Sequence, residues 1–334
     1  MRRSTRFAPF AFTLTFALAA GALLAAPAAA DFRLEKNLPL APGGELVVET
    51  AGGSVTVTGG ASTGARIVVT SERDRAAVEE RYTFEFSSEG GQARVINKRR
   101  GSGGFFGGWF DWGRGIGLHF EIQVPRQTRV DLHSSGGGLR VSNVEGAARL
   151  RSSGGGVRAF DMAGDVDARS SGGGVEVRRV RGDLRLGSSG GRVTAEAITG
   201  DVTAESSGGG VEVSEVSGDV DASSSGGGVH LDGIGGRVTA GSSGGPVTAV
   251  LAANNTQGGT FSSSGGGVRV DVDPGARLSI DASSSGGSVV CDLPVTVQGK
   301  QSRSSLRGQL NGGGAPLHLR SSGGGIHIGS GSDG

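Results

Sequence analysis

The sequence predicts an all-β protein: a narrow, right-handed parallel β-solenoid (β-helix) with 18-residue coils, preceded by a less regular β N-terminal cap region. The phrase Ser-Ser-Gly-Gly returns every 18 residues, and so strict a period is typical of a solenoid. Apolar residues keep fixed places within each unit. Glycine makes up 66 of the 334 residues without a collagen period, which favours a repeat architecture. The phrase begins at Ser134, Ser152, Ser170, Ser188, Ser206, Ser224 and Ser242.

Residues 1–30 have the pattern of a secretory signal peptide. Arg2, Arg3 and Arg6 precede an apolar run, and the small residues Ala28 and Ala30 suit cleavage before residue 31. The alternative is an uncleaved membrane anchor, which the short apolar run disfavours. We therefore expect an exported protein that is periplasmic, at the cell surface or secreted, with no transmembrane span in the mature chain.

Residues 31–130 are expected to form an N-terminal β region. Residues 47–58 resemble an early coil, because AGGSVTV stands where SSGGGVEV stands in the later repeats. The segments ARIVVTSE, YTFEFSSE and ARVINK have the alternation and the β-branched residues of strands. Residues 73–81 suit either a short helix or a charged turn between strands.

Residues 101–117 are expected to form an aromatic, glycine-rich loop. Glycine lets such a loop move, and aromatic rings supply contact area at low entropic cost. One interpretation is an exposed loop that contacts a partner, a glycan or a membrane surface. The other is a plug that folds back over the open end of the solenoid core. The candidate interaction residues are Phe105, Phe106, Trp109, Phe110 and Trp112.

Each regular unit alternates apolar and polar residues. Counted from the first Ser of the phrase, the apolar positions are 6, 8, 11, 15 and 17. Alternation by two indicates a strand with one buried face. The parity changes between positions 8 and 11, so we expect the chain to turn a corner there, and to turn another between position 17 and the next unit.

The two halves of a unit predict where the serines point. Aligning SSGGGVEVS with EVSGDVDAS sets Ser207 against the apolar Val216, so the second Ser of each phrase should face the core and the first should sit at a corner. Coils about 4.8 Å apart would let each buried hydroxyl donate to the next. The expectation is an internal serine ladder. Positions 7 and 16 carry charges and should face outward.

The period loosens after Ser242. The phrase returns at Ser263 and Ser284, 21 residues apart each time. The extra residues, around 254–255 and 273–275, suit longer turns at one corner. We expect the solenoid to occupy residues 131–328 and residues 329–334 to be a disordered tail.

One row of carboxylates is a candidate for cation binding. Position 14 is Asp165, Asp183, Asp201 and Asp219, each after a glycine. Hard cations prefer several oxygen ligands, whereas Asp after Gly is also ordinary turn chemistry. The second explanation is favoured, so no metal site is assigned.

The remaining residues predict no catalytic or cofactor-binding site. Cys291 follows two valines in a strand-like run, which indicates a buried, inert thiol rather than a nucleophile. The histidines lack metal-type spacing, and no nucleophile elbow or phosphate loop is present. The 33 basic and 32 acidic residues form no basic patch, so nucleic acid is not an expected partner.

The phrases SSGGGVEVSEVSGDVDASSSGGGV and LHLRSSGGGIHI resemble the bacterial putative-adhesin family of domains of unknown function, DUF4097. That family repeats a T/S-S-G-D-I/V-x-V phrase, and this chain differs by writing SSGGG where the family commonly writes SSGD. The resemblance covers roughly residues 45–328. It implies an exported or surface-exposed parallel β-solenoid and supplies no catalytic residues.

The function expected from the sequence is that of a non-catalytic exported scaffold or adhesin, which makes protein, glycan or surface contacts in the cell envelope. The alternative is a divalent-cation-binding or carbohydrate-active β-helix protein that uses the Asp row. The partner is not identified by the sequence, and no cofactor is expected.

Overall fold

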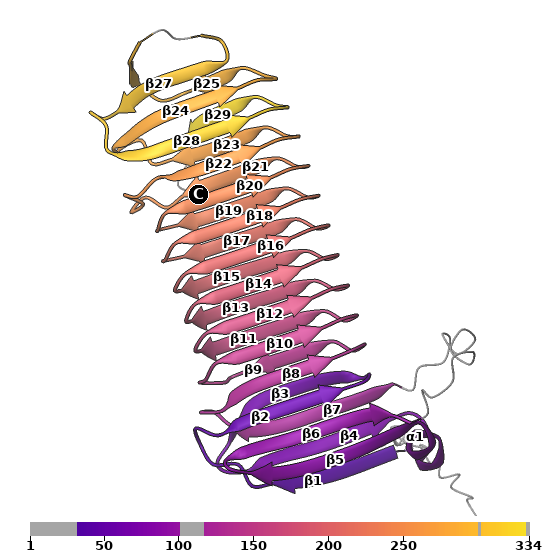
Figure 1. Ribbon diagram of the computed structural model, residues 1–334. Coiled ribbons are helices and arrows are strands. Elements are labelled where there is room, and N and C mark those ends of the chain that lie inside the picture. Colours follow the sequence, from indigo (N-terminus) through magenta and orange to yellow (C-terminus); the bar gives the residue numbers. More distant parts are fainter. Residues whose placement is uncertain (1–31, 101–116, 300–301, 332–334) are drawn as a thin grey trace, which may run out of the picture.

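The protein is an elongated β-solenoid whose coils stack along one axis (Figure 1). The computed structural model describes residues 32–100, 117–299 and 302–331. Its strands form two long sheets, which we call sheet A, with 14 strands, and sheet B, with 15 strands. The all-β, mostly parallel solenoid that the repeat predicts is therefore confirmed.

A regular coil consists of one strand in each sheet and two corners. In one unit, β16 (Val202–Ser206) lies in sheet B and β17 (Val211–Val216) lies in sheet A. The Ser-Gly-Gly-Gly segment turns the first corner, and a Gly-Asp segment turns the second. Each strand pairs in parallel with the strand one unit away, as Val211 does with Val229. The buried Val, Ala, Leu and Ile side chains of both sheets form one continuous core.

The regular strands repeat these two positions along the chain. Those of sheet B are β8 (Arg129–Ser134), β10 (Ala148–Ser152), β12 (Val166–Ser170), β14 (Leu184–Ser188), β16, β18 (Val220–Ser224), β20 (Val238–Ser242) and β22 (Gly259–Ser263). Those of sheet A are β9 (Leu139–Ser142), β11 (Val157–Ala163), β13 (Val175–Arg181), β15 (Val193–Thr199), β17, β19 (Val229–Ile234), β21 (Val247–Leu251) and β23 (Val268–Val272).

The parity change inside each unit is not a corner, and that expectation was wrong. Position 10 instead holds one residue with a left-handed backbone inside the sheet A strand, as at Arg179, with φ of 54°, and Glu215, also 54°. Arg178 and Val180 pair with the neighbouring strand, and Arg179 between them does not. One such residue shifts the alternation of side chains without ending the strand.

The buried serine is the first of each phrase, so the predicted orientation of the doublet was also wrong. Ser206 is buried and Ser207 is exposed. The physical reason is that the inward parity of positions 15 and 17 continues into the next phrase, because β16 does not end until Ser206. The same burial holds at Ser134, Ser152, Ser170, Ser188, Ser224, Ser242, Ser263, Ser284 and Ser321.

The buried hydroxyls bond the backbone rather than one another. The Ser206 hydroxyl donates to the Gly191 carbonyl of the preceding coil at 2.9 Å and accepts the Gly209 N–H at 3.0 Å. Both polar functions of the hydroxyl are therefore satisfied away from water. The corner leaves no room for a side chain beside it, because a Cβ at Gly191 would lie 2.4 Å from the Gly174 nitrogen.

The N-terminal region extends both sheets. Its strands are β1 (Phe32–Leu38), β2 (Glu45–Thr50), β3 (Ser54–Ala61), β4 (Ala65–Ser71), β5 (Tyr82–Glu89), β6 (Gln92–Arg99) and β7 (Leu118–Pro125). The charged segment before β5 is helix α1 (Arg75–Arg81), capped by the Asp74 carboxylate, which accepts the Ala77 N–H at 2.7 Å. The early coil expected over residues 47–58 corresponds to β2 and β3.

The C-terminal region comprises β24 (Leu278–Ser284), β25 (Val289–Cys291), β26 (Val295–Val297), β27 (Ser305–Leu310), β28 (Ala315–Ser321) and β29 (Ile326–Ser330). The last strand extends two residues beyond the expected end of the solenoid, because Gly329 and Ser330 pair with Asp271 and Val272. In the longer corner before β22, the buried Asn255 amide donates to the carbonyls of Ile234 and Gly236.

At both ends, one coil is inserted out of sequence order. The coil of β28 and β29 lies between that of β22 and β23 and that of β24 and β25. The coil of β2 and β3 likewise separates β6 and β7 from β8 and β9. Segments far apart in the sequence therefore lie side by side at each end of the stack (Figure 1).

Candidate functional site

A shallow groove of about 490 Å³ runs along the Ser-Ser-Gly-Gly corner of the regular coils. We call it the corner groove. Two kinds of residue line it. One is the second Ser of successive phrases, which the corner turns outward. The other is the residue just before each phrase, which faces outward near the end of a sheet B strand. The lining residues used below are His133, Arg151, Arg169, Ser171, Ser189, Glu205 and Ser207.

The charges of the corner groove are unevenly distributed along it. Arg151 and Arg169 stand on neighbouring coils, and both contact the Asp167 carboxylate, at 3.3 Å and 3.1 Å. Two coils further, Glu205 occupies the equivalent place. The groove is thus basic toward the N-terminal end and acidic toward the other, with a row of hydroxyls between.

The Asp row at position 14 has a structural role. One carboxylate oxygen of Asp183 accepts the backbone N–H of Asp201 at 3.0 Å, and Asp183 itself donates its N–H to Asp165 at 3.0 Å. Asp201 and Asp219 continue this series to the N–H of Arg237. The side chains are exposed. Among residues 32–100, 117–299 and 302–331, no three His, Cys, Asp or Glu side chains are grouped as metal ligands.

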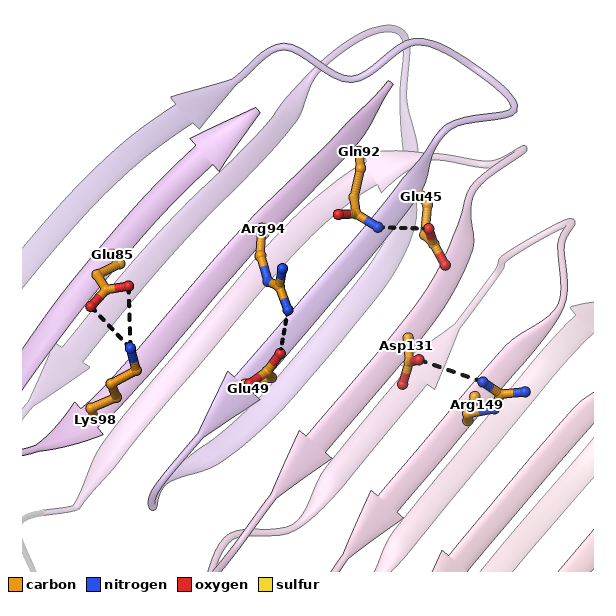
Figure 2. Close-up of polar contacts among 8 residues, drawn as sticks. All are labelled: Glu45, Glu49, Glu85, Gln92, Arg94, Lys98, Asp131 and Arg149. Carbon is orange, nitrogen blue, oxygen red and sulfur yellow. Dashed lines mark hydrogen bonds and ion pairs between the residues drawn. The ribbon is translucent and has the colours of Figure 1, made fainter. Parts of the chain in front are cut away.

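The outer face of sheet B carries cross-strand polar contacts near its N-terminal end (Figure 2). Arg94 on β6 meets Glu49 on β2 at 2.7 Å, and Arg149 on β10 lies 3.9 Å from Asp131 on β8. Lys98 and Glu85 join β6 to β5 at 3.2 Å. These side chains are largely exposed, so each pair contributes at most about 1 kcal/mol.

The two outward rows predicted from the repeat are found on the surface. Position 7 lies on the outer face of sheet A and position 16 on that of sheet B, and adjacent coils place opposite charges side by side, as for Arg158 and Glu176 at 3.1 Å. Asp161 and Arg179 form a two-pronged pair, and hydrogen bonding from Arg179 lowers the pKa of Asp161.

Cys291 and the histidines belong to no group of three or more metal-ligating side chains in the described part of the chain. Cys291 is half-buried, and burial raises the pKa of its thiol, which disfavours the reactive thiolate. His230 is exposed, whereas His327 lies 2.8 Å from Asp292 at the surface.

Two predicted features fall outside the described residues: the signal peptide over residues 1–30 and the five aromatic candidates from Phe105 to Trp112. The described strands that flank the aromatic segment are β6 in sheet B and β7 in sheet A.

Sequence reasoning missed the corner groove, because it assigned the second Ser of each phrase to the core. The signal was present in the sequence. Continuing the alternation from positions 15 and 17 by one more step reaches the first Ser of the next phrase, which buries that residue and leaves its neighbour exposed.

These features define a β-solenoid whose repeated polar residues mainly maintain its own backbone and whose variable residues face outward. The chain belongs to the Toastrack DUF4097 family, whose model matches residues 44–329. This confirms the resemblance noted in the sequence. The comparison with curated proteins found no match.

Three solved structures are similar to the chain. The first, named a "putative cell adhesion protein" from Clostridium sporogenes, is 10% identical, with a TM-score of 0.26 and 90% of this chain and 100% of that chain covered. A "putative adhesin" from Bacteroides fragilis is 10% identical, with a TM-score of 0.38 and coverage of 89% and 97%. A "putative lipid binding protein" from Parabacteroides distasonis is 11% identical, with a TM-score of 0.31 and coverage of 89% and 96%.

Within the described ranges, no helix is both long enough and apolar enough to cross a membrane.

Proposed function

We propose that the protein is a non-catalytic, exported scaffold or adhesin of the cell envelope, which contacts an extended glycan through the corner groove. Export rests on the signal-peptide pattern of residues 1–30. The absence of catalysis is an expectation from the sequence, which shows no nucleophile elbow, phosphate loop or metal-type histidine spacing.

The observation that carries the proposal is the row of exposed serines in a long groove. Ser171, Ser189 and Ser207 occupy equivalent places on consecutive coils, so they recur about every 4.8 Å. Hydroxyls both donate and accept hydrogen bonds, which suits the hydroxyl-rich surface of a sugar chain. A polymer with a repeating unit can make the same contact on several coils, and such multivalent contacts add up even when each is weak.

The charged ends of the groove favour a glycan that carries charge as well. Arg151 and Arg169 share only one carboxylate, Asp167, so this end keeps a net positive charge. Arginine recognises carboxylate and phosphate groups in a forked geometry. An acidic envelope polysaccharide would therefore place anionic groups at this end and hydroxyls along the serine row.

The test is a pull-down from isolated cell-envelope polysaccharide with the mature protein, residues 31–334. The variant Ser171→Asp/Ser189→Asp/Ser207→Asp places three carboxylates in the groove and should abolish retention of acidic polysaccharide. The control Ser243→Asp/Ser264→Asp/Ser322→Asp changes the same repeat position on coils outside the groove. Equal retention by both triple variants, or none by the unmodified protein, would contradict the proposal.

A further inference from the structure

Over the six regular strands from β9 to β19, the outer face of sheet A is divided into a basic half and an acidic half of three strands each. Strands β9, β11 and β13 carry five arginines and two carboxylates, a net charge of +3. Strands β15, β17 and β19 carry four carboxylates and neither Lys nor Arg, a net charge of −4. The basic half has Arg140, Arg158, Arg178, Arg179 and Arg181 against Asp161 and Glu176. The acidic half has Glu196, Glu212, Glu215 and Asp232.

Ion pairs within the molecule leave this division in place. Arg158 and Arg178 meet Glu176 inside the basic half, and Arg178 reaches across the boundary to Glu196 at 3.2 Å. From the neighbouring corner, Arg192 meets Glu212 at 2.9 Å. Even with Arg192 counted, the acidic half keeps a net charge of −3, because no other Lys or Arg stands between residues 193 and 236.

The position of the boundary makes the face complementary to itself. Three strands lie on each side of the boundary between β13 and β15. A two-fold axis at the boundary, parallel to the strands, places β13 of one copy against β15 of the other, β11 against β17, and β9 against β19. Every basic strand then faces an acidic one, and each contact occurs twice, as a two-fold interface requires.

We propose that two copies of this chain associate side by side and antiparallel through the outer faces of sheet A. Six strands at about 4.8 Å and seven residues at about 3.3 Å give a face of roughly 650 Å². A standard stable interface buries about 800 Å² per partner. The face is thus somewhat small and held mainly by charge, so the dimer is weak and sensitive to salt.

The outer face of sheet B is a poorer choice over the same coils. Its strands β10, β12 and β14 carry four arginines and Asp167, a net charge of +3. Strands β16, β18 and β20 carry only Glu205 and Asp221, a net charge of −2, against −4 for the acidic half of sheet A. None of the charged residues counted on sheet A lines the corner groove, so dimerisation and the proposed glycan contact can be tested separately.

The test uses two triple variants of the mature chain with opposite charge changes. Glu212→Arg/Glu215→Arg/Asp232→Arg changes the acidic half from −4 to +2, which makes the whole face basic. Arg158→Glu/Arg179→Glu/Arg181→Glu changes the basic half from +3 to −3, which makes it acidic. Position 10 accepts both substitutions, because Arg179 and Glu215 already occupy it with the same backbone conformation.

Sedimentation equilibrium at low and high salt distinguishes the outcomes. The unmodified protein should dimerise at low salt, with an association constant that falls on the order of tenfold or more at about 0.5 M salt. Each triple variant alone should remain monomeric, and an equimolar mixture of the two should restore a dimer. The control Glu205→Arg/Asp221→Arg, on the sheet B side, should dimerise normally.

Four results would overturn the proposal. The first is an unmodified protein that stays monomeric at low salt. The second is a pair of folded triple variants, checked by circular dichroism, that fail to associate with each other. The third is loss of the dimer in the sheet B control alone. Growth beyond a dimer with concentration would contradict the two-fold arrangement, because a staggered contact between faces does not close.

Discussion

At the scale of single residues, the two serines of each Ser-Ser-Gly-Gly phrase recur equally often but have different roles. From Ser152 to Ser263, the first Ser of each phrase links a carbonyl of the preceding coil to an N–H of its own corner, and the second faces solvent. Sequence periodicity alone shows both as equally regular. Only the direction of the side chain separates the residue that maintains the fold from the residue that is available to a partner.

Replacing the first Ser should therefore cost far more stability than replacing the second. In Ser206→Ala, the Gly191 carbonyl and the Gly209 N–H lose their partner, and we expect a loss of about 1–3 kcal/mol in the free energy of unfolding. Ser207→Ala should stay within about 0.5 kcal/mol of the unmodified protein. Urea denaturation measures both, and a reversed order would mean that the doublet is oriented the other way.

A carboxylate in the C-terminal cap, which we define as β24 to β27 (residues 278–310), should make stability depend on pH. Asp281 on β24 accepts two hydrogen bonds from Arg320 on β28, at 3.0 Å and 3.2 Å, and these lower its pKa, with smaller contributions from Arg307 and His318. Because the folded pKa lies below the unfolded one, the stabilisation is present above the unfolded value, about 3.9, and is lost as the pH falls through the folded value.

The variant Asp281→Asn should thus be less stable than the unmodified protein at pH 7, by about 1 kcal/mol or less, since the pair is open to solvent. The difference should shrink as the pH is lowered below about 4. Chemical denaturation at several pH values measures it. A difference that stays constant down to pH 2 would show that Asp281 stabilises through packing instead.

At the scale of one element, the coil is a unit that contacts mainly its two neighbours. Each strand of the regular section pairs with residues 18 positions before and after it, as Val193 does with Val175 and Val211. The stability of such a stack is approximately a sum of coil and interface contributions. Removing one whole coil leaves every remaining pair in register.

Deletion of residues 206–223, one complete unit, should leave a folded and shorter solenoid. The chain then joins Glu205 to Ser224, which supplies the same buried hydroxyl that Ser206 supplied. We expect circular dichroism to show an unchanged β spectrum and the melting temperature to stay within a few degrees. Deletion of residues 206–214, half a unit, is the control and should prevent correct folding, because it puts Glu215 in the place of the buried Ser206 and moves every later strand to the other sheet.

At the scale of the whole molecule, the ends do not follow this nearest-neighbour rule. The coil of β28 and β29 is contributed by the end of the chain but lies one place inside the stack. Residues 273–314 are consequently held against the solenoid by a segment that is synthesised after them. The end of the stack closes only when these distant segments meet, and such non-local pairing is slow to form.

Truncation after Gly314 should therefore release the C-terminal cap. Removal of β28 and β29 takes from β25 its partner and from β24 the partner that joins it to the solenoid, leaving β24 paired only with β27, and it exposes the edges of β22 and β23. Hydrogen exchange should show lost protection over residues 278–310 and retained protection in the coils between residues 139 and 242. Protection of the cap in the truncated chain would show that it folds without the inserted coil.

Much of this architecture is determined by the sequence alone. The 18-residue period dictates parallel strands one coil apart, because equivalent residues stack only when each turn returns to the same place. The positions of Val, Leu and Ala identify the buried faces, and the charges at positions 7 and 16 identify the outer ones. The repeated phrases also indicate the family, although SSGGG stands where the family commonly has SSGD.

Other features were decided by the tertiary structure. Position 10 adopts a left-handed backbone whether the residue is Arg, Glu or Asp. No residue type therefore identifies this position in the sequence, and the parity change was interpreted as a corner. The Asp row lies where backbone N–H groups need acceptors, which only the stacking of neighbouring coils reveals. The inserted coils and the two halves of the sheet A face also depend on which strands lie side by side. The sequence contains the local repeat, whereas contacts between distant segments arise only once the chain has folded.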